Sequence, residues 1–253
     1  MIPERRYRKP PVVESLCEIY FSDSKWDDTI PGAFYERVKS DFPNKRQREI
    51  QQAEIMLGTS GEAAAGVRRL PPWMQFVSAN GERMLQIARD LLVVNQLRPY
   101  PHFEAWEPEV YKALAIYNEL AKPGKVVRLG LRYINRVVIA QARVQMEKYF
   151  TIYPQLPQAL GDTHGAFLVR VEVPQPQQGR TVLITFGTAE PPAPGANGQA
   201  FLLDLYDILQ RECPPDKATL EKEIQTAHDN VVKAFEGSIT DQLRELFEPE
   251  EQS

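Results

Sequence analysis

The stretch RLGLRYINR, residues 128–136, alternates between two kinds of residue. Arg128, Arg132 and Arg136 occur at even spacing with Gly130 between the first two, and mostly apolar residues fill the odd positions. Successive side chains of a strand point to opposite faces, so this period of two places the three arginines on one face. It predicts a long strand over residues 126–139.

The first strand predicted in the chain carries a complementary pattern, because Glu14 and Glu18 share one of its faces. If the two strands are neighbours, we expect Glu14 and Glu18 to form ion pairs across the sheet with Arg132 and Arg136. The alternative is that Arg128, Arg132 and Arg136 form a binding site for phosphate or carboxylate groups. The sequence leaves both interpretations open.

The same order of elements occurs twice along the chain: a strand, a helix, three or four antiparallel strands, and a helix. The first set comprises predicted strands at residues 12–21, 50–57, 73–79, 83–88 and 91–97, with helices at 31–42 and 104–121. The second set comprises strands at 126–139, 166–173, 181–186 and 201–209, with helices at 144–150, 216–236 and from 238 onward. We therefore expect an α+β fold in which two tandem units form one curved antiparallel sheet packed by helices. The TATA-binding-protein-like folds offer an analogy for this arrangement.

The predicted organisation has three parts: an extended N-terminal arm (1–11), a first α+β unit (12–124) and a second unit with the C-terminal helices (125–253). We expect the two units to form one compact domain. Gly58–Pro72 and Thr188–Gln199 are rich in Gly, Ala and other loop-forming residues and are predicted to be flexible loops.

Three shorter signals concern turns and caps. Asn80-Gly81 predicts a type I′ hairpin turn, because both residues tolerate positive φ. Ser238 followed by Asp241 predicts a capping box at the start of the last helix. The stretch FEGSITDQLR, residues 235–244, predicts a kinked helix whose amphipathic end either docks a partner or folds back on the sheet.

Aromatic residues gather between a strand and a helix in LRPYPHFEAW, residues 97–106. Tyr100 and Trp106 are candidate binding residues, as parts of an aromatic cage or a base-stacking platform. The alternative is that these aromatics pack the helix against the sheet. His102 lies next to the helix start, where a capping or packing role is expected.

The charge balance argues against a dedicated nonspecific DNA-binding protein. There are 30 Lys and Arg residues against 34 Asp and Glu residues, which gives a net charge of −4, whereas phosphate binding requires an excess of positive charge. Nucleic-acid or nucleotide binding through the arginine-bearing strand, aided by the basic stretch 45–48, is kept as an alternative that is not favoured.

Signatures of catalysis, metal binding and membrane insertion are missing. The sequence contains no GxSxG, GxxxxGK[ST], GxGxxG after a strand, HExxH or paired CxxC motif. Cys17 and Cys213 form no disulfide framework, and the three histidines have no metal-ligand spacing with them. No apolar run reaches the length of a membrane span, and no signal peptide is recognised. We expect a cytoplasmic protein with no catalytic residues, metal or cofactor; a hydrolase whose groups converge from distant positions is a third hypothesis.

Four stretches of the chain resemble segments of a known family. They are PPVVE (10–14), YPHFEAW (100–106), LGLRYINR (129–136) and FEGSITD (235–241). Together they are similar to a sporadically distributed family of prokaryotic proteins with no established activity. The sequence departs from that family at residues 101–103, where a glycine and a tryptophan are expected after Tyr100. The patchy distribution implies an accessory role, as in defence, stress-response or toxin–antitoxin loci. The missing catalytic motifs, the broad sheet and the two predicted flexible loops lead us to expect a non-enzymatic component that interacts with a protein partner.

Overall fold

Two central strands join the halves of the chain. In the computed structural model, β1 (Val12–Ser22) pairs antiparallel with β6 (Lys125–Ile139), with Cys17 opposite Leu131. Because β1 begins the first unit and β6 begins the second, this pairing places both units in one sheet. The two strands are therefore the neighbours that the predicted cross-strand contacts require.

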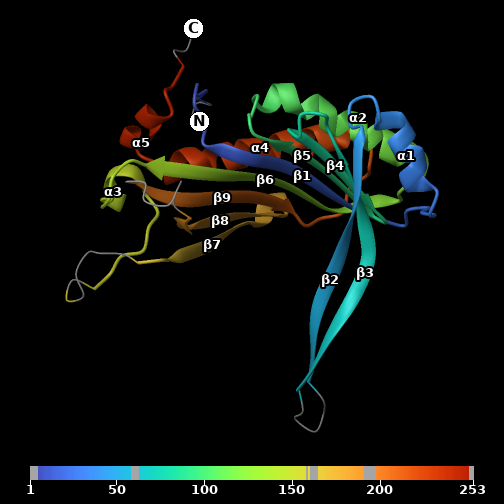
Figure 1. Cartoon of the computed structure of the whole chain (residues 1–253), viewed down its shortest axis with the longest axis horizontal. Coiled ribbons are helices and arrows are strands. Elements are labelled where there is room, and N and C mark those ends of the chain that lie inside the picture. The colour runs from blue at the N-terminus through green and yellow to red at the C-terminus, as the bar shows by residue number, and fades with distance from the viewer. Residues whose placement is uncertain (1–4, 58–62, 158, 160–164, 191–197, 251–253) are drawn as a thin grey trace.

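The structure describes residues 5–57, 63–157, 159, 165–190 and 198–250. Within these residues, nine strands form a single antiparallel sheet in the order β2-β3-β4-β5-β1-β6-β9-β8-β7 (Figure 1). The other elements of the first unit are α1 (Ile30–Val38), β2 (Asn44–Leu57), β3 (Ala63–Val77), β4 (Arg83–Ala88), β5 (Leu91–Leu97) and α2 (Phe103–Ala121). Those of the second are α3 (Met146–Tyr149), β7 (Leu168–Gln175), β8 (Arg180–Ala189), β9 (Gln199–Leu209), α4 (Lys217–Ser238) and α5 (Asp241–Leu246). The α+β class and the antiparallel sheet are confirmed.

The long helices α2 and α4 lie along one side of the sheet (Figure 1). α4 begins at the N-cap Asp216, whose side chain accepts a hydrogen bond from the Thr219 N–H at 3.0 Å. Its apolar residues recur at helical spacing and are at most 3 % exposed: Leu220, Ile224, Ala227 and Val231. Together with α2 and the inner face of the sheet, this stripe encloses a core that draws residues from both units.

The prediction of a loop over Gly58–Pro72 is wrong for its second part. Residues 63–72 belong to β3, which pairs with β2 in a long hairpin that projects from the body on the side away from the helices (Figure 1). Residues 58–62 of this predicted loop and residues 191–197 of the second predicted loop lie outside the described part of the chain. Strand pairing supplies the order that the composition of this segment did not indicate.

Two local predictions are also corrected. The turn between β3 and β4 has positive φ at Gly81 (76°) but not at Asn80, so it is not type I′. It is a longer loop closed by the Ser78 N–H, which donates to the Arg83 carbonyl at 2.9 Å. The cap of α5 is Thr240 rather than Ser238, whose hydroxyl instead donates to the Ala234 carbonyl within α4.

The described part of the predicted N-terminal arm is docked against the C-terminal region. Tyr7 forms an isolated β-bridge with Pro249 and is only 6 % exposed. Its hydroxyl donates to Glu236 at 2.6 Å, and burial together with this carboxylate raises the pKa of Tyr7 above its ordinary range. Ion pairs from Arg6 to Glu104 and from Lys9 to Glu248 add to the attachment.

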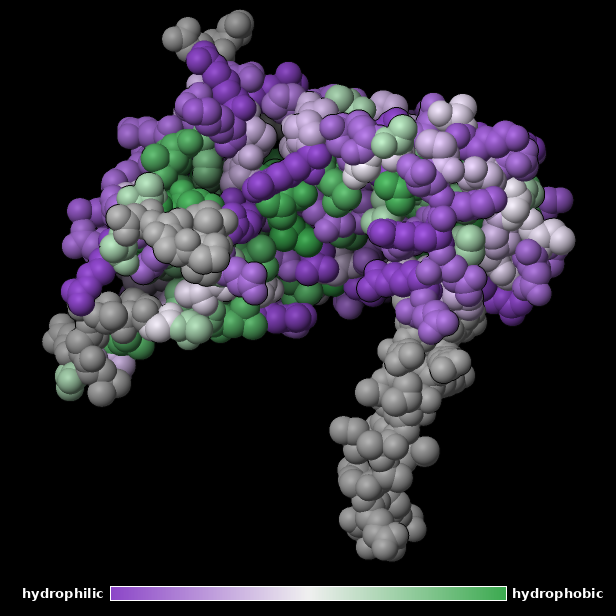
Figure 2. All heavy atoms as spheres, viewed as in Figure 1, coloured by the Kyte–Doolittle hydropathy of each residue, from purple (hydrophilic) through white to green (hydrophobic). Residues whose placement is uncertain are grey.

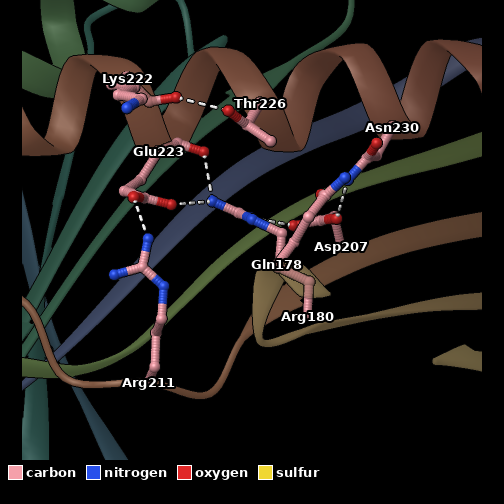
Figure 3. A network of polar contacts seen from close by, with 8 residues as sticks. All are labelled: Gln178, Arg180, Asp207, Arg211, Lys222, Glu223, Thr226 and Asn230. Carbon is pink, nitrogen blue, oxygen red and sulfur yellow. Dashed lines mark hydrogen bonds and ion pairs between the residues drawn. The ribbon is translucent and has the colours of Figure 1, made fainter. Parts of the chain in front are cut away.

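A buried ion network fastens α4 to the sheet (Figure 3). Arg180 on β8 is 1 % exposed; it donates to Asp207 on β9 and, at 2.8 Å, to the backbone carbonyl of Glu223 on α4. The Glu223 carboxylate also accepts from Arg180 and from Arg211. Desolvation raises the pKa of Asp207, while Arg180 opposes this shift. Among the described residues of this network, Arg180 is thus the cation that is fully withdrawn from water, and Asp207 depends on it while Glu223 shares it with Arg211.

We predict that Arg180→Met lowers the free energy of unfolding by about 3–5 kcal/mol, because it leaves Asp207 buried without its cation and removes the buried one of the two arginines that contact Glu223. Arg211→Met is the matched control: Arg211 contacts the same Glu223, but its side chain is 51 % exposed, so we expect a loss of less than about 1 kcal/mol. Urea denaturation of both variants measures the difference. Equal losses would show that the buried network is not what holds α4.

Candidate functional site

The side of the sheet that faces away from α2 and α4 is the candidate site, and we call it the helix-free face. Alternate residues of β1, β6 and β9 point to it, while the residues between them enter the core. In Figure 2, hydrophobic and hydrophilic side chains are interspersed over the region of these strands, so the surface is mixed rather than uniformly charged. The charged side chains of this face therefore lie among apolar ones.

Tyr206 on β9 is the central residue of this face. Its hydroxyl donates to Glu18 on β1 at 2.6 Å and accepts from Arg128 on β6 at 2.8 Å. Desolvation, followed by the charge of Glu18, raises the pKa of Tyr206 above its ordinary range, so the phenol stays protonated and can donate. Arg128 also lies over the rings of Tyr20 (5.1 Å) and Tyr206 (5.6 Å).

Gly130 makes this arrangement sterically feasible. Tyr206 reaches from β9 across β6 to β1, and its ring lies directly over Gly130. A Cβ atom at Gly130 would stand 2.4 Å from Tyr206 Cε2, which is far inside contact distance. Because Gly130 has no side chain, it leaves room between two arginines for the ring of a tyrosine from another strand.

Arg132 forms the second charged group of the face. Its Nε donates to Asp204 Oδ1 at 2.8 Å, and Nη2 donates to the other carboxylate oxygen. This two-pronged hydrogen bonding raises the pKa of Arg132, and Glu18 adds to the effect. The Asp204 side chain is only 11 % exposed, so the pair is held in one geometry rather than moving freely in solvent.

The arginine-bearing strand is therefore where we predicted it, but its partners are different. Asp204 and Tyr206 of β9 contact Arg132 and Arg128, whereas Glu14 and Glu18 were the expected partners of Arg132 and Arg136. Glu14 instead accepts from Asn95 at 2.6 Å. Arg136 donates to the carbonyl of Glu190 at 2.8 Å. Register explains the change, because Glu18 is opposite Gly130 and Glu14 is opposite Ile134.

A chain of side-chain amides continues the site across the first unit. Arg46 Nε donates to Gln75 (2.6 Å), Gln75 to Gln86 (2.7 Å), Gln86 to Asn95 (2.9 Å), and Asn95 to Glu14. The three amides are at most 5 % exposed. Because each amide donates in the same direction, the chain links a guanidinium on β2 to a carboxylate on β1 through five neighbouring strands.

A small apolar cluster lies beside this chain. It consists of buried Leu16, Ala88, Leu91 and Val93, with the half-buried rings of Tyr20 and Trp73 packed against it. Leu16 lies between Glu14 and Glu18 on β1, so the apolar cluster adjoins the charged group around Tyr206. The helix-free face thus combines ordered charges, two accessible aromatic rings and apolar surface.

Tyr100 and Trp106 lie on the opposite side of the sheet. Trp106 is 2 % exposed in the main core, which fits the packing interpretation rather than a stacking platform. The Tyr100 hydroxyl is 2.9 Å from that of Tyr133, which is in turn 3.2 Å from His228 Nδ1. Because the sheet separates them from the arginines, these aromatics cannot belong to the same site.

The four stretches that carry the family resemblance meet around a cavity of about 90 Å³ on this side. It is lined by Pro10 and Pro11, by Tyr100 and Phe103, by Tyr133 with Asn135, and by Phe235 with Glu236. His102 lines it too and has a positive φ of 95° just before α2. The cavity is lined mainly by apolar groups and is small, which indicates a junction between the chain ends, α2 and α4.

Other classes of site receive no support within the described residues. No group of three or more His, Cys, Asp or Glu residues could hold a metal ion there. Cys17 and Cys213 are buried free thiols, and burial raises the pKa of both. No helix in the described ranges is long and apolar enough to cross a membrane.

Comparison with known proteins identifies no relative that assigns a function. No family model matches the chain, and no curated protein matches it. One similar solved structure is that of the S. pombe Pct1 RNA triphosphatase in complex with the Spt5 CTD, at 10 % identity and a TM-score of 0.14, covering 96 % of this chain and 88 % of that one. A TM-score this low supports neither a shared fold nor a shared activity, and the TATA-binding-protein-like analogy gains no support from it.

We predict that Gly130→Ala destabilises the protein by about 1–3 kcal/mol, because the new methyl group forces the Tyr206 ring away from Glu18. In a Tyr206→Ser background the same substitution should cost less than about 0.5 kcal/mol, since no ring is left to displace. A double-mutant cycle in urea measures the coupling. The same cost in both backgrounds would mean that Gly130 serves some other purpose than to admit Tyr206.

Proposed function

We propose that this chain is a non-enzymatic protein-binding component that docks a partner protein on its helix-free face. The observation that carries the proposal is the ordered cluster of Tyr20, Tyr206, Arg128 and Arg132, half-buried and next to apolar surface. Tyrosine and arginine are the residue types that protein interfaces favour, and they often dominate the binding energy.

The fixed geometry of the cluster supports this role. Arg128 is held between two tyrosine rings and a hydroxyl, and Arg132 is held by both oxygens of Asp204. Side chains that are already ordered lose little conformational entropy when a partner binds. The face is therefore prepared for binding rather than assembled by it.

Charge balance favours a protein over a nucleic acid. The two arginines of the cluster are matched by two carboxylates, Glu18 and Asp204, through the contacts described above. A phosphate backbone would have to compete with these groups for the guanidinium donors, and its affinity depends on an excess of cations. A protein surface of mixed polarity needs no such excess.

The hairpin of β2 and β3 extends beside this face. It projects from the body on the side opposite the helices (Figure 1), so a docked partner would have the sheet beneath it and the hairpin next to it. The amide chain from Arg46 to Glu14 connects the base of the hairpin to the central strands. Resemblance to a sporadically distributed prokaryotic family supports an accessory role for the partner complex, as in defence or stress response.

The proposal predicts that a protein partner co-purifies in fixed stoichiometry from the native host and binds again when both proteins are purified. Arg128→Ala should raise the Kd at least tenfold, equivalent to about 1.4 kcal/mol. Arg37→Ala is the control, because Arg37 on α1 is an arginine that is likewise held by a side-chain partner, Glu119, but lies in the helical layer; it should leave the Kd unchanged.

Three results would contradict the proposal. Partner binding that ignores Arg128→Ala and Tyr206→Ser would place the interface elsewhere. Salt-sensitive nucleic-acid binding that Arg128→Ala weakens would replace the protein partner with a nucleic acid. Repeated purification without a stoichiometric partner would remove the basis for an interaction role. Circular dichroism and melting temperature confirm that each variant is folded before its binding is compared.

A further inference from the structure

The edge strand β7 has an unusual surface for the end of a sheet. In the described part of the chain it pairs with β8 alone and forms one end of the strand order. Leu168 is 71 % exposed and Val171 is 40 % exposed, so two large apolar residues face solvent on one short strand. An exposed apolar edge is a template for pairing with another strand.

The hydrogen-bonding pattern identifies which backbone groups of β7 are available. The Thr188 N–H donates to the Phe167 carbonyl at 3.1 Å, which directs the backbone of Phe167 toward β8. Because the direction alternates along an antiparallel strand, the backbone groups of Leu168, Arg170 and Glu172 point outward. Pro174, the next outward position, lacks an N–H group and limits the edge at that end.

The outward residues are complementary to a second copy of themselves. The Arg170 and Glu172 side chains are 58 % and 63 % exposed, and their charged ends are 3.6 Å apart on the same face. In an antiparallel pair of β7 strands centred on Val171, Arg170 lies opposite Glu172 of the second copy, and the reverse also holds. Both are outward-pointing residues, so each such pair can exchange its N–H···O=C hydrogen bonds as well as its charges.

Neighbouring registers are less favourable. Centring the pair on Arg170 would place two arginines opposite each other, and centring it on Glu172 would do the same with two glutamates. The register centred on Val171 also brings Val169 opposite Val173 of the second copy and covers Val171 with its own counterpart. Charge, hydrogen bonding and apolar burial therefore select the same register.

The opposite edge of the sheet does not share this property. β2 begins with Asn44–Arg48, where Lys45, Arg46 and Arg48 carry positive charge. Basic side chains on an edge repel a second copy and are a common protection against strand pairing. Among the side chains that the structure describes on the two edges, Arg170 and Glu172 of β7 form an opposite-charge pair on one strand face, whereas the basic side chains dominate the start of β2.

We propose that the chain forms a symmetric homodimer through antiparallel pairing of β7 with β7 of a second copy, centred on Val171. The same surface patch is used by both copies, as a two-fold axis requires. The sheet continues across the dimer and places two helix-free faces in one assembly, which would allow two partners, or one repeated partner, to bind. This inference concerns β7 and holds whether or not the helix-free face binds a protein.

Sedimentation equilibrium of the full chain tests the dimer. Glu172→Arg should raise the dimer Kd at least tenfold, because it places Arg170 opposite an arginine. Arg170→Glu should do the same with two glutamates. The double variant, with Arg170→Glu and Glu172→Arg together, restores opposite charges and should restore the dimer. Mixing the two single variants should give a heterodimer, since one copy then offers only arginines and the other only glutamates.

Two results would overturn the inference. A wild-type chain that stays monomeric up to high micromolar concentration would show that β7 does not self-pair. A dimer that survives both single substitutions would place the interface elsewhere. Because the Arg170 and Glu172 side chains are exposed, we expect their substitution to leave the fold intact. An unchanged melting temperature of the monomeric variants shows that loss of the dimer is not loss of the fold. Partner binding is measured separately, so failure of one proposal does not imply failure of the other.

Discussion

The antiparallel pairing of β1 with β6 is the constraint on which the rest of the molecule depends. It joins the two units, and its register determines which face of each strand enters the core. A shift by one residue would exchange the two faces of β6 and bury arginines against the helices. Leu129, Leu131 and Val137 are at most 1 % exposed on the inner face, so the apolar pattern strongly selects the observed register.

On the outer face of β6, the small residue Gly130 determines how the charged residues around it are arranged. Gly130 admits Tyr206 from β9, and Tyr206 then connects Glu18 on one side with Arg128 on the other. Three adjacent strands are thereby tied together by side chains as well as by their backbones. The result is a face whose arginines already have partners on neighbouring strands.

Buried and half-buried arginines have different roles here. Arg180 is enclosed beneath α4, where its carboxylates would be costly without it. The Arg132 side chain is 37 % exposed and is paired with Asp204 on a face that no helix covers. At the sheet edges the contrast is between the start of β2, whose basic side chains discourage pairing, and β7, whose opposite charges permit it.

Much of this protein follows from its sequence, because periodicity and local chemistry act over short distances. The period of two in residues 128–136 predicted the strand and its arginine face, and helical periodicity predicted a helix over residues 216–236, where α4 is found. Asp204 and Asp207 are three residues apart on β9 and therefore lie on opposite faces, where they contact Arg132 and Arg180. Composition alone failed at residues 63–72, where pairing with β2 imposes a strand.

The partners of the arginines were decided by tertiary structure. Sequence alternation indicates that Asp204 and Tyr206 share a face, but not that β9 is the strand beside β6. Strand order depends on how two units, far apart along the chain, pack their apolar faces on common helices. For the same reason, nothing in the sequence indicated that β7 would be an edge. The side-chain pattern of each strand is local and can therefore be predicted from the sequence. Which strands become neighbours depends on how the whole chain buries one shared core.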